Sequence, residues 1–222
     1  MGKLKQGLAL AALLALQAAW APAYAATAAP AAATNDADAA LVAQIAARLA
    51  HAKGVRARFT QTQTLAAMKA PLVSTGSMLF FRDRGLIWQI DTPYRKTWVM
   101  RDGGLTVLDA SGKRVAGGSQ QGARGATEIG KMMRSMLGGD LSALYSQFDV
   151  QARGTPARWE MRLVPRQPQI AQALRGIDMQ GGDFLQSLRI TLANGDLTQF
   201  DFSGSAEVIE LAPADQTLFG TP

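Results

Sequence analysis

The chain has 222 residues, of which 48% are hydrophobic, and its 23 basic and 17 acidic residues give a formal net charge of +6. It contains no cysteine, which excludes disulfides, thiolate metal sites and lipidation at a cysteine. The basic residues are scattered among acidic ones and form no run, so nucleic acid is not an expected partner.

The first 25 residues have the pattern of a secretory signal peptide. Lys3 and Lys5 precede an uncharged run, residues 7–20, in which Leu and Ala dominate, and Ala23-Tyr24-Ala25 ends the pattern. The run is shorter than the roughly 20 residues that a membrane-spanning helix requires. The sequence therefore predicts a signal peptide over residues 1–25, cleavage after Ala25 and export to the periplasm.

A single domain is expected over residues 36–222, after an Ala-rich, disordered spacer at residues 26–35. The domain begins with a predicted helix from Asp36 to Lys53, in which apolar residues repeat at helical spacing: Leu41, Ile45 and Leu49. Gly54 is placed to cap the C-terminal end of this helix.

From residue 55 the apolar period changes to two, which is typical of β-strands. Nine strands are predicted, at residues 55–64, 73–82, 86–92, 96–101, 105–109, 158–164, 176–180, 184–192 and 197–203. Most of the links between them are short. A short link permits only antiparallel neighbours, because a parallel pair needs a long crossover.

Two helical runs separate the strands into two blocks. Their apolar stripes are Ile129, Met132, Met133, Met136 and Leu137 in the first run, and Leu141, Leu144, Tyr145 and Phe148 in the second. A sheet of this size twists and coils rather than staying flat. We therefore expect an α+β fold, an incomplete and half-open antiparallel β-barrel with helices plugging the concave side.

Residues that would carry catalysis are sparse. His51 is the only histidine, and it lies near the end of the first predicted helix, where a positive charge is structurally ordinary. No G-x-S-x-G elbow occurs, and the glycine-rich residues 117–125 lack the G-K-[ST] ending of a phosphate-binding loop. Without cysteine or a second histidine, a zinc site would need carboxylates almost alone. We predict that the chain is not an enzyme and has neither metal nor cofactor.

Large apolar side chains gather on one face of the predicted strands. Alternation along each strand assigns these side chains to one side: Met78 and Phe80, then Leu86, Trp88 and Ile90, then Trp98 and Met100. Two interpretations remain open, and periodicity favours core packing over an apolar binding surface, although methionine is common where a surface adapts to varied ligands. Arg82 shares the face of Met78 and Phe80, so it either reaches solvent at the strand end or bonds to carbonyls or carboxylates.

Several short motifs in a fixed order resemble those of outer-membrane lipoprotein carriers, the LolA-like family. They are Phe59-Thr60-Gln61 as an F-x-Q strand after a helix, Ser74-Thr75-Gly76 as S-x-G, then Arg82, and Trp88 before Pro93. The runs 137–148, 159–165 and 188–202 are similar to the rest of that family. Each motif is weak alone, but their order and spacing behind a signal peptide cover nearly the whole mature chain.

The resemblance implies a monomeric periplasmic carrier that holds the acyl chains of lipoproteins in an apolar cavity. It would receive them from a donor transporter in the inner membrane and pass them to an acceptor in the outer membrane. The same resemblance leaves room for a carrier of another lipid or of a polyene or polyketide product. An enzyme or a purely structural sheet protein is the weaker alternative.

The resemblance also assigns roles to individual residues. In this family the arginine that matches Arg82 holds a helical lid through backbone carbonyls, and the tryptophan that matches Trp88 faces the cavity. Asp83 replaces the proline that usually follows the arginine, and the C-terminal segment of the best-known carriers is missing, so the latch and the hand-off are left open. The expected cavity residues are Phe59, Met78, Phe80, Leu86, Trp88, Ile90, Trp98, Met100, Met132, Met133, Met136 and Leu137.

Overall fold

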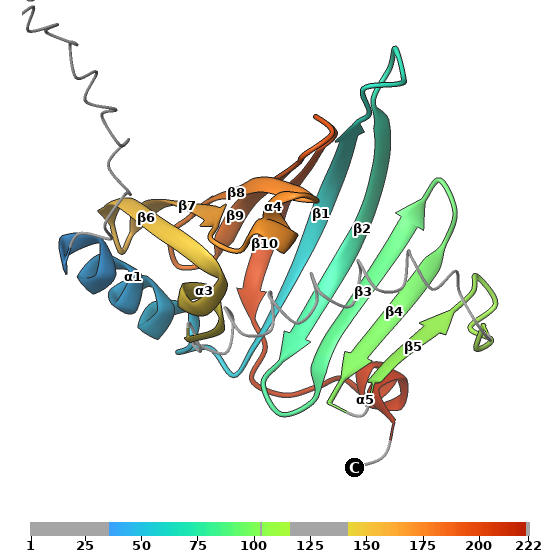
Figure 1. Cartoon of the computed structure of the whole chain (residues 1–222). Coiled ribbons are helices and arrows are strands. Elements are labelled where there is room, and N and C mark those ends of the chain that lie inside the picture. Colours follow the sequence, from blue (N-terminus) through green and yellow to red (C-terminus); the bar gives the residue numbers. More distant parts are fainter. Residues whose placement is uncertain (1–35, 103, 116–141, 221–222) are drawn as a thin grey trace, which may run out of the picture. The chain divides into compact units, whose positions relative to one another are not determined.

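The structure is a computed structural model, and it describes residues 36–102, 104–115 and 142–220 (Figure 1). Its helices are α1 (Asp36–Leu49), α3 (Ser142–Gln147), α4 (Pro168–Ala171) and α5 (Pro213–Phe219). Its strands are β1 (Gly54–Thr64), β2 (Leu72–Phe81), β3 (Gly85–Thr92), β4 (Lys96–Arg101), β5 (Gly104–Leu108), β6 (Phe148–Thr155), β7 (Arg158–Pro165), β8 (Leu174–Gly181), β9 (Leu185–Leu192) and β10 (Leu197–Glu207). The predicted signal peptide, the spacer and the first apolar stripe lie outside the described residues.

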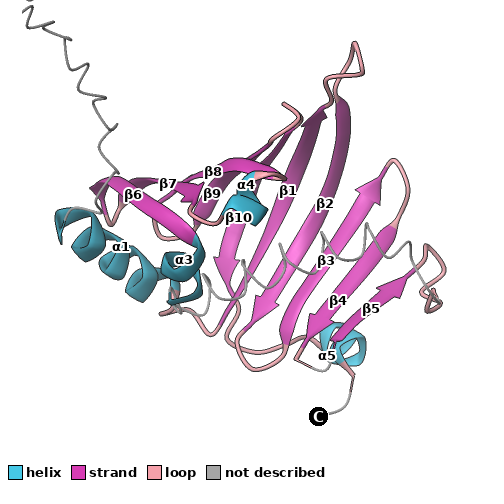
Figure 2. Ribbon diagram, in the orientation of Figure 1, coloured by secondary structure: helices cyan, strands magenta, loops and turns pink. Residues whose placement is uncertain are grey.

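All ten strands form one antiparallel sheet in the order β5-β4-β3-β2-β1-β10-β9-β8-β7-β6 (Figure 2). Two meanders, β1 to β5 and β6 to β10, meet where β1 pairs with β10. The edge strands β5 and β6 are not hydrogen-bonded to each other, so the sheet does not close. The predicted α+β class and the incomplete antiparallel barrel are therefore confirmed.

The strands follow the period of two that predicted them. In β7 the buried residues Trp159, Met161 and Leu163 alternate with the exposed residues Glu160 and Arg162. All nine predicted strands are present, most with bounds shifted by one or two residues and β10 extended to Glu207. No helix that the structure describes combines the length and the apolar character of a membrane span.

The predicted end of the first helix is wrong. Helix α1 ends at Leu49, and Gly54 is the first residue of β1, where it pairs with Phe81. A Cβ atom added at Gly54 would lie 2.6 Å from the Phe81 ring and 2.9 Å from the Phe80 carbonyl oxygen. The close approach of β1 and β2, rather than a helix cap, therefore explains the glycine.

Strand β6 and helix α5 were missed by the sequence analysis. Phe148 was predicted to belong to a helical stripe, whereas α3 ends at Gln147 and Phe148 begins β6. Its side chain fits either period, but the buried residues Val150 and Ala152 continue an alternation of two. Helix α5 is seven residues long and has a proline at its start, so it offers too few turns for a helical period to be visible.

Apolar clusters lie on both faces of the sheet. The larger one packs α1, through Val42, Ile45 and Leu49, against strands of both meanders. On the opposite face, the smaller cluster joins α5 and the segment before it to β2, β3 and β4. Its buried members are Leu79, Phe81, Ile87, Val99, Leu211 and Phe219. We call the face with the larger cluster the inner face and the other the outer face.

Candidate functional site

Strand register brings the predicted apolar residues of β2, β3 and β4 onto the inner face. Residues directly opposite each other in an antiparallel pair share a face of the sheet. The register runs through three rows: Phe80, Leu86 and Met100; Met78, Trp88 and Trp98; and Gly76, Ile90 and Lys96. Strand β5 adds Leu105 opposite Met100 and Val107 opposite Trp98. Phe59 joins them because it pairs with Gly76.

Four of the predicted cavity residues are fully packed. Phe59, Met78, Phe80 and Leu86 are each at most 4% exposed and belong to the cluster under α1. A space beside Met78 and Leu49 has a volume of about 10 Å³, roughly the room of one water molecule. A hydrocarbon chain does not fit there, so the α1 end of the inner face is filled.

Farther along the same face, the side chains are only half-buried. Trp88, Ile90, Trp98, Met100 and Leu105 all have intermediate exposure, and we call these five residues the β3–β5 strip. They come from three adjacent strands and share one face of the sheet, where Trp88 is opposite Trp98 and Met100 is opposite Leu105. A hydrocarbon chain that lay on the strip would bury apolar surface that is otherwise partly exposed to water.

Trp88 connects the strip to the packed core. Its ring stacks on Phe59 with centroids 4.1 Å apart, and it meets Phe200 edge-on at 5.3 Å and Phe202 at 6.3 Å. Gly76 makes this arrangement possible, because a Cβ there would lie 2.6 Å from Phe59 and 2.0 Å from the Gln89 carbonyl oxygen. The glycine of the S-x-G motif therefore leaves room for the aromatic cluster.

Arg82 lies just beyond β2 and contacts the end of α1. Its guanidinium donates hydrogen bonds to the carbonyl oxygens of Ala50 and of Ala52, the latter at 3.0 Å. Its backbone N–H donates to the Lys53 carbonyl oxygen at 3.0 Å. These bonds fix the carbonyls that follow the last turn of α1. The predicted lid residues Met132, Met133, Met136 and Leu137 lie outside the described residues, so their link to Arg82 stays a prediction.

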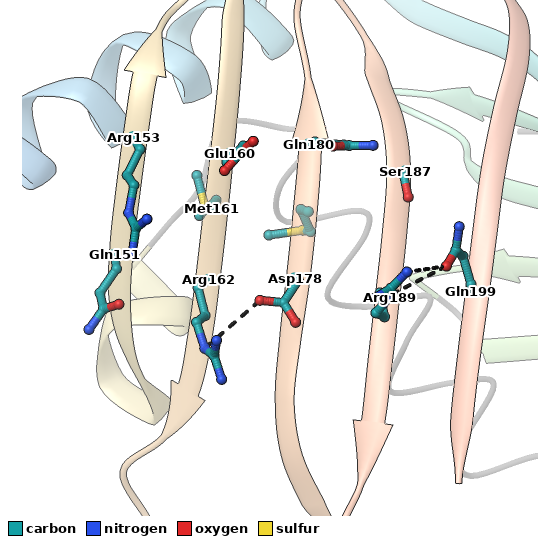
Figure 3. A pocket seen from close by; sticks show the side chains of 11 residues that line it. Gln151, Arg153, Glu160, Met161, Arg162, Asp178, Gln180, Ser187, Arg189 and Gln199 are labelled. Carbon is teal, nitrogen blue, oxygen red and sulfur yellow. Dashed lines mark hydrogen bonds and ion pairs between the residues drawn. The ribbon is translucent and has the colours of Figure 1, made fainter. Parts of the chain in front are cut away.

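The outer face of the second meander carries a shallow groove of different chemistry (Figure 3). Its volume is about 370 Å³, and charged or amide side chains of β6 to β10 line most of it. Arg162 lies 3.8 Å from Asp178, and Arg189 donates to the Gln199 side-chain oxygen at 2.8 Å. Such a polar lining does not suit a hydrocarbon chain.

A family model described as outer membrane lipoprotein carrier protein LolA-like matches residues 27–218. The chain belongs to this LolA-like family. Members of the family are periplasmic carriers and not enzymes, so membership supports a periplasmic role in binding lipid or lipoprotein. A comparison of the sequence with curated proteins found no match.

Several solved structures are similar to this LolA-like chain. The MucA/MucB complex of Pseudomonas aeruginosa gives a TM-score of 0.47 at 13% identity, over 84% of this chain and 61% of that chain. A LolA superfamily protein of Nitrosomonas europaea gives 0.41 at 9% identity, over 83% and 97%. A putative outer membrane lipoprotein-sorting protein domain of Vibrio parahaemolyticus gives 0.40 at 10% identity, over 80% and 96%. This chain thus spans about 60% of the MucB chain's length.

Two described side chains have shifted pKa values, and both lie outside the β3–β5 strip. Burial, helped by the charge of Asp38, raises the pKa of Tyr145, and a hydrogen bond from the Ser111 side chain lowers the pKa of Asp109. Among the described residues, no three histidine or carboxylate side chains are grouped as metal ligands.

Sequence reasoning missed two parts of this face. Phe200 and Phe202 come from β10, and their place beside Trp88 depends on the pairing of β10 with β1. Lys96 lies on the inner face opposite Ile90, and its ammonium stands over the Trp98 ring, 5.4 Å from the centroid. Alternation from Trp98 and Met100 would have placed Lys96 on this face.

Proposed function

We propose that this chain carries acylated lipoproteins through the periplasm and binds their acyl chains on the β3–β5 strip. The observation that carries the proposal is the half-buried state of the strip beside a core that is filled. Membership of the LolA-like family supports the same class of ligand. The binding surface would be an extension of the core and not a hole within it.

Hydrocarbon burial makes such a carrier necessary. At about 0.8 kcal/mol per methylene, a chain of roughly fourteen methylenes costs on the order of 10 kcal/mol to expose to water. Binding on a half-buried strip removes the acyl chain from water, and it also buries the apolar surface of the strip that is still exposed. Trp88, Trp98 and Met100 supply large contact areas, and methionine adapts to chains of different shape.

In this proposal the chain receives its cargo from a donor transporter in the inner membrane and releases it to an acceptor in the outer membrane. Release requires a gate that is only weakly held. The gate we propose is a helical lid containing Met132, Met133, Met136 and Leu137, with Arg82 as its latch, in equilibrium between two states a few kcal/mol apart. The bonds of Arg82 to the carbonyl oxygens of Ala50 and Ala52, which follow α1, support a role in holding backbone carbonyls.

The latch is tested by Arg82→Leu. We expect the variant to fold, because Arg82 is exposed, and to release a bound acyl ligand faster than the parent protein does. Stopped-flow release of a fluorescent fatty acid measures this rate, and Arg84→Leu, two residues along the same turn, is the matched control. Equal release rates in the parent and Arg82→Leu would remove Arg82 from the gate.

A second candidate is a carrier of another lipid or of a polyene or polyketide product. The half-buried rings of Trp88 and Phe202, at the edge of the aromatic cluster, favour it, because flat conjugated chains stack on aromatic rings.

Native mass spectrometry of protein purified from its own periplasm separates the two. An acylated peptide bound to the chain supports the first candidate, and a bound lipid or pigment without peptide supports the second. Trp88→Ala with Trp98→Ala should lose the ligand, whereas Arg162→Ala with Arg189→Ala, on the outer groove, should keep it. A parent protein that is empty in every preparation would contradict both.

A further inference from the structure

We propose that Lys96 gives the β3–β5 strip a preference for acyl ligands that carry an anionic headgroup, a carboxylate or a phosphate. This inference rests on the proposed acyl-binding function and names its ligand class. Lys96 begins β4, two residues before Trp98 and four before Met100, and all three side chains lie on the inner face. Lys96 thus stands at one end of the apolar strip.

Lys96 is the one charged residue on the inner face of the described strands β1 to β5. Across the described strands β1 to β5, the register gives every other inner-face position an uncharged residue. Its cross-strand neighbour is Ile90, so no carboxylate stands opposite it. A single cation on an apolar face sets a local preference for negative charge.

Asp91, the acidic residue of the β3–β4 hairpin, has its side chain on the outer face and not beside Lys96. Asp91 accepts a hydrogen bond from the Gln89 side chain at 2.6 Å and lies 3.9 Å from Arg95. Gln89 and Asp91 alternate with Trp88 and Ile90, so their side chains point to the outer face. Among the described residues, the contact of the Lys96 ammonium is the Trp98 ring, 5.4 Å from its centroid, and no carboxylate lies within ion-pair distance.

A half-buried lysine at the end of an apolar strip suits an amphiphile with an acidic head, because the strip can bind the tail while the lysine binds the head. The ammonium has three donors, and charge-assisted bonds to carboxylate or phosphate oxygens are stronger than neutral ones. Lys96 and Met100 are roughly 13 Å apart along β4 at about 3.3 Å per residue, which gives the tail a length of strip to cover. An acyl group attached through an ester or amide, as in a lipoprotein, carries no charge and gains nothing from Lys96, so this preference favours the second candidate, a carrier of another lipid, over the lipoprotein carrier.

The chain contains a matched control for the cation–ring contact itself. The Lys53 ammonium stands 5.3 Å from the centroid of the Phe81 ring, nearly the same distance as in the Lys96 pair. Phe81 is 7% exposed and belongs to the outer-face cluster with α5, away from the strip. Replacing Lys53 thus removes a positive charge and a cation–ring contact without touching the strip, so a change in ligand preference that appears only on replacing Lys96 reports a charge at the strip itself.

The test compares ligands that share a tail and differ in the head. Oleate is set against oleyl alcohol, and lysophosphatidylglycerol against monooleoylglycerol, by displacement of a neutral apolar fluorophore from the full exported chain. We expect the parent to bind each anionic ligand about tenfold more tightly than its neutral partner. The two pairs distinguish carboxylate from phosphate as the preferred head.

Lys96→Gln should bring each ratio close to one while keeping the affinity for the neutral ligands, and Lys96→Arg should retain the preference. Lys53→Gln should behave as the parent does. If the parent binds neutral and anionic ligands equally, or if Lys96→Gln keeps the preference, the inference is wrong while acyl binding stands. If the parent binds none of the four ligands, the proposed function fails, and this inference fails with it.

Discussion

The two ends of the inner face are built from similar residues but differ in what covers them. At the α1 end, Trp159 in β7 is 1% exposed and its indole N–H donates to the Gly182 carbonyl oxygen at 3.0 Å. On the strip, Trp98 in β4 alternates in the same way but is half-buried, and a lysine stands over its ring. Periodicity assigns both to a buried face, whereas cover by other elements decides which becomes core. The same pattern can therefore specify a core and a binding surface within one sheet.

Truncating each of the two tryptophans should separate the packed core from the strip most strongly. Trp159→Ala should lower the free energy of unfolding by about 3–5 kcal/mol, because it leaves a cavity and orphans the Gly182 carbonyl oxygen. Trp98→Ala should cost about 1–2 kcal/mol, since part of its ring is already in water. Urea unfolding of the two variants measures the difference. Equal losses would mean that the strip is core.

The next largest effect is expected from Gly76→Ala. The new methyl group would meet the Gln89 carbonyl oxygen and the Phe59 ring, so β2 and β3 must separate or Phe59 must shift, at a cost of roughly 1–3 kcal/mol. Ser74→Ala, at the other end of the S-x-G motif, is the control and should be nearly silent in urea unfolding. If Gly76→Ala left the urea midpoint unchanged, the aromatic cluster would have room for an added methyl group.

Helix α5 offers a test that the two faces act independently. Arg56 lies 2.5 Å from Asp215, which is 12% exposed, and Arg101 donates to the Phe219 carbonyl oxygen at 2.6 Å. Arg56→Met should cost about 1 kcal/mol and speed proteolysis within residues 208–220, whereas Arg58→Met on the same side of β1 should not. Acyl binding should be unchanged in both. Loss of binding in Arg56→Met would couple the outer cluster to the strip.

The smallest effect concerns the turn after β5. Hydrogen bonds from the Ser111 hydroxyl and from the backbone N–H groups of Lys113 and Ser111 hold the pKa of Asp109 below its ordinary value of 3.8. A lowered folded-state pKa means that the stabilisation is present above pH 3.8 and is lost as pH falls through the folded value. The protection of the Ser111 and Lys113 amides from exchange, measured relative to their intrinsic rates at each pH, should therefore fall only in acid. Asp109→Asn should remove that pH dependence, and a fall in protection near neutral pH in the parent would contradict the role of Asp109.

Sequence patterns were sufficient for nine of the ten described strands and insufficient for the pairing that joins the two meanders. Alternation such as Trp159, Met161 and Leu163 marks a strand locally, and short turns fix neighbours within each meander. The pairing of β1 with β10 joins segments more than 130 residues apart, and no local pattern encodes it. The aromatic cluster of Phe59 and Trp88 with Phe200 depends on that pairing, so its completion could not be predicted.

The candidate site shows the same limit. Met78 and Trp88 were predicted to line one cavity, and they are opposite each other in the register, yet Met78 is 4% exposed and Trp88 is half-buried. Burial of this kind depends on where α1 lies, which alternation within a strand does not reveal. Lys96 was overlooked because a charged residue at a strand end is usually assigned to solvent.

Quenching by a fatty acid brominated on its tail shows whether the acyl chain lies on the β3–β5 strip or in the core beneath α1. Two single-tryptophan proteins are needed, one that keeps Trp98 and one that keeps Trp159, with the remaining tryptophans replaced by phenylalanine. Fluorophore displacement first shows that both proteins bind the fatty acid. We then expect strong quenching of Trp98 and no quenching of Trp159, because bromine quenches only at contact. Quenching of Trp159 with Trp98 unaffected would place the ligand in the α1-covered core and contradict the assignment of the strip as the binding surface.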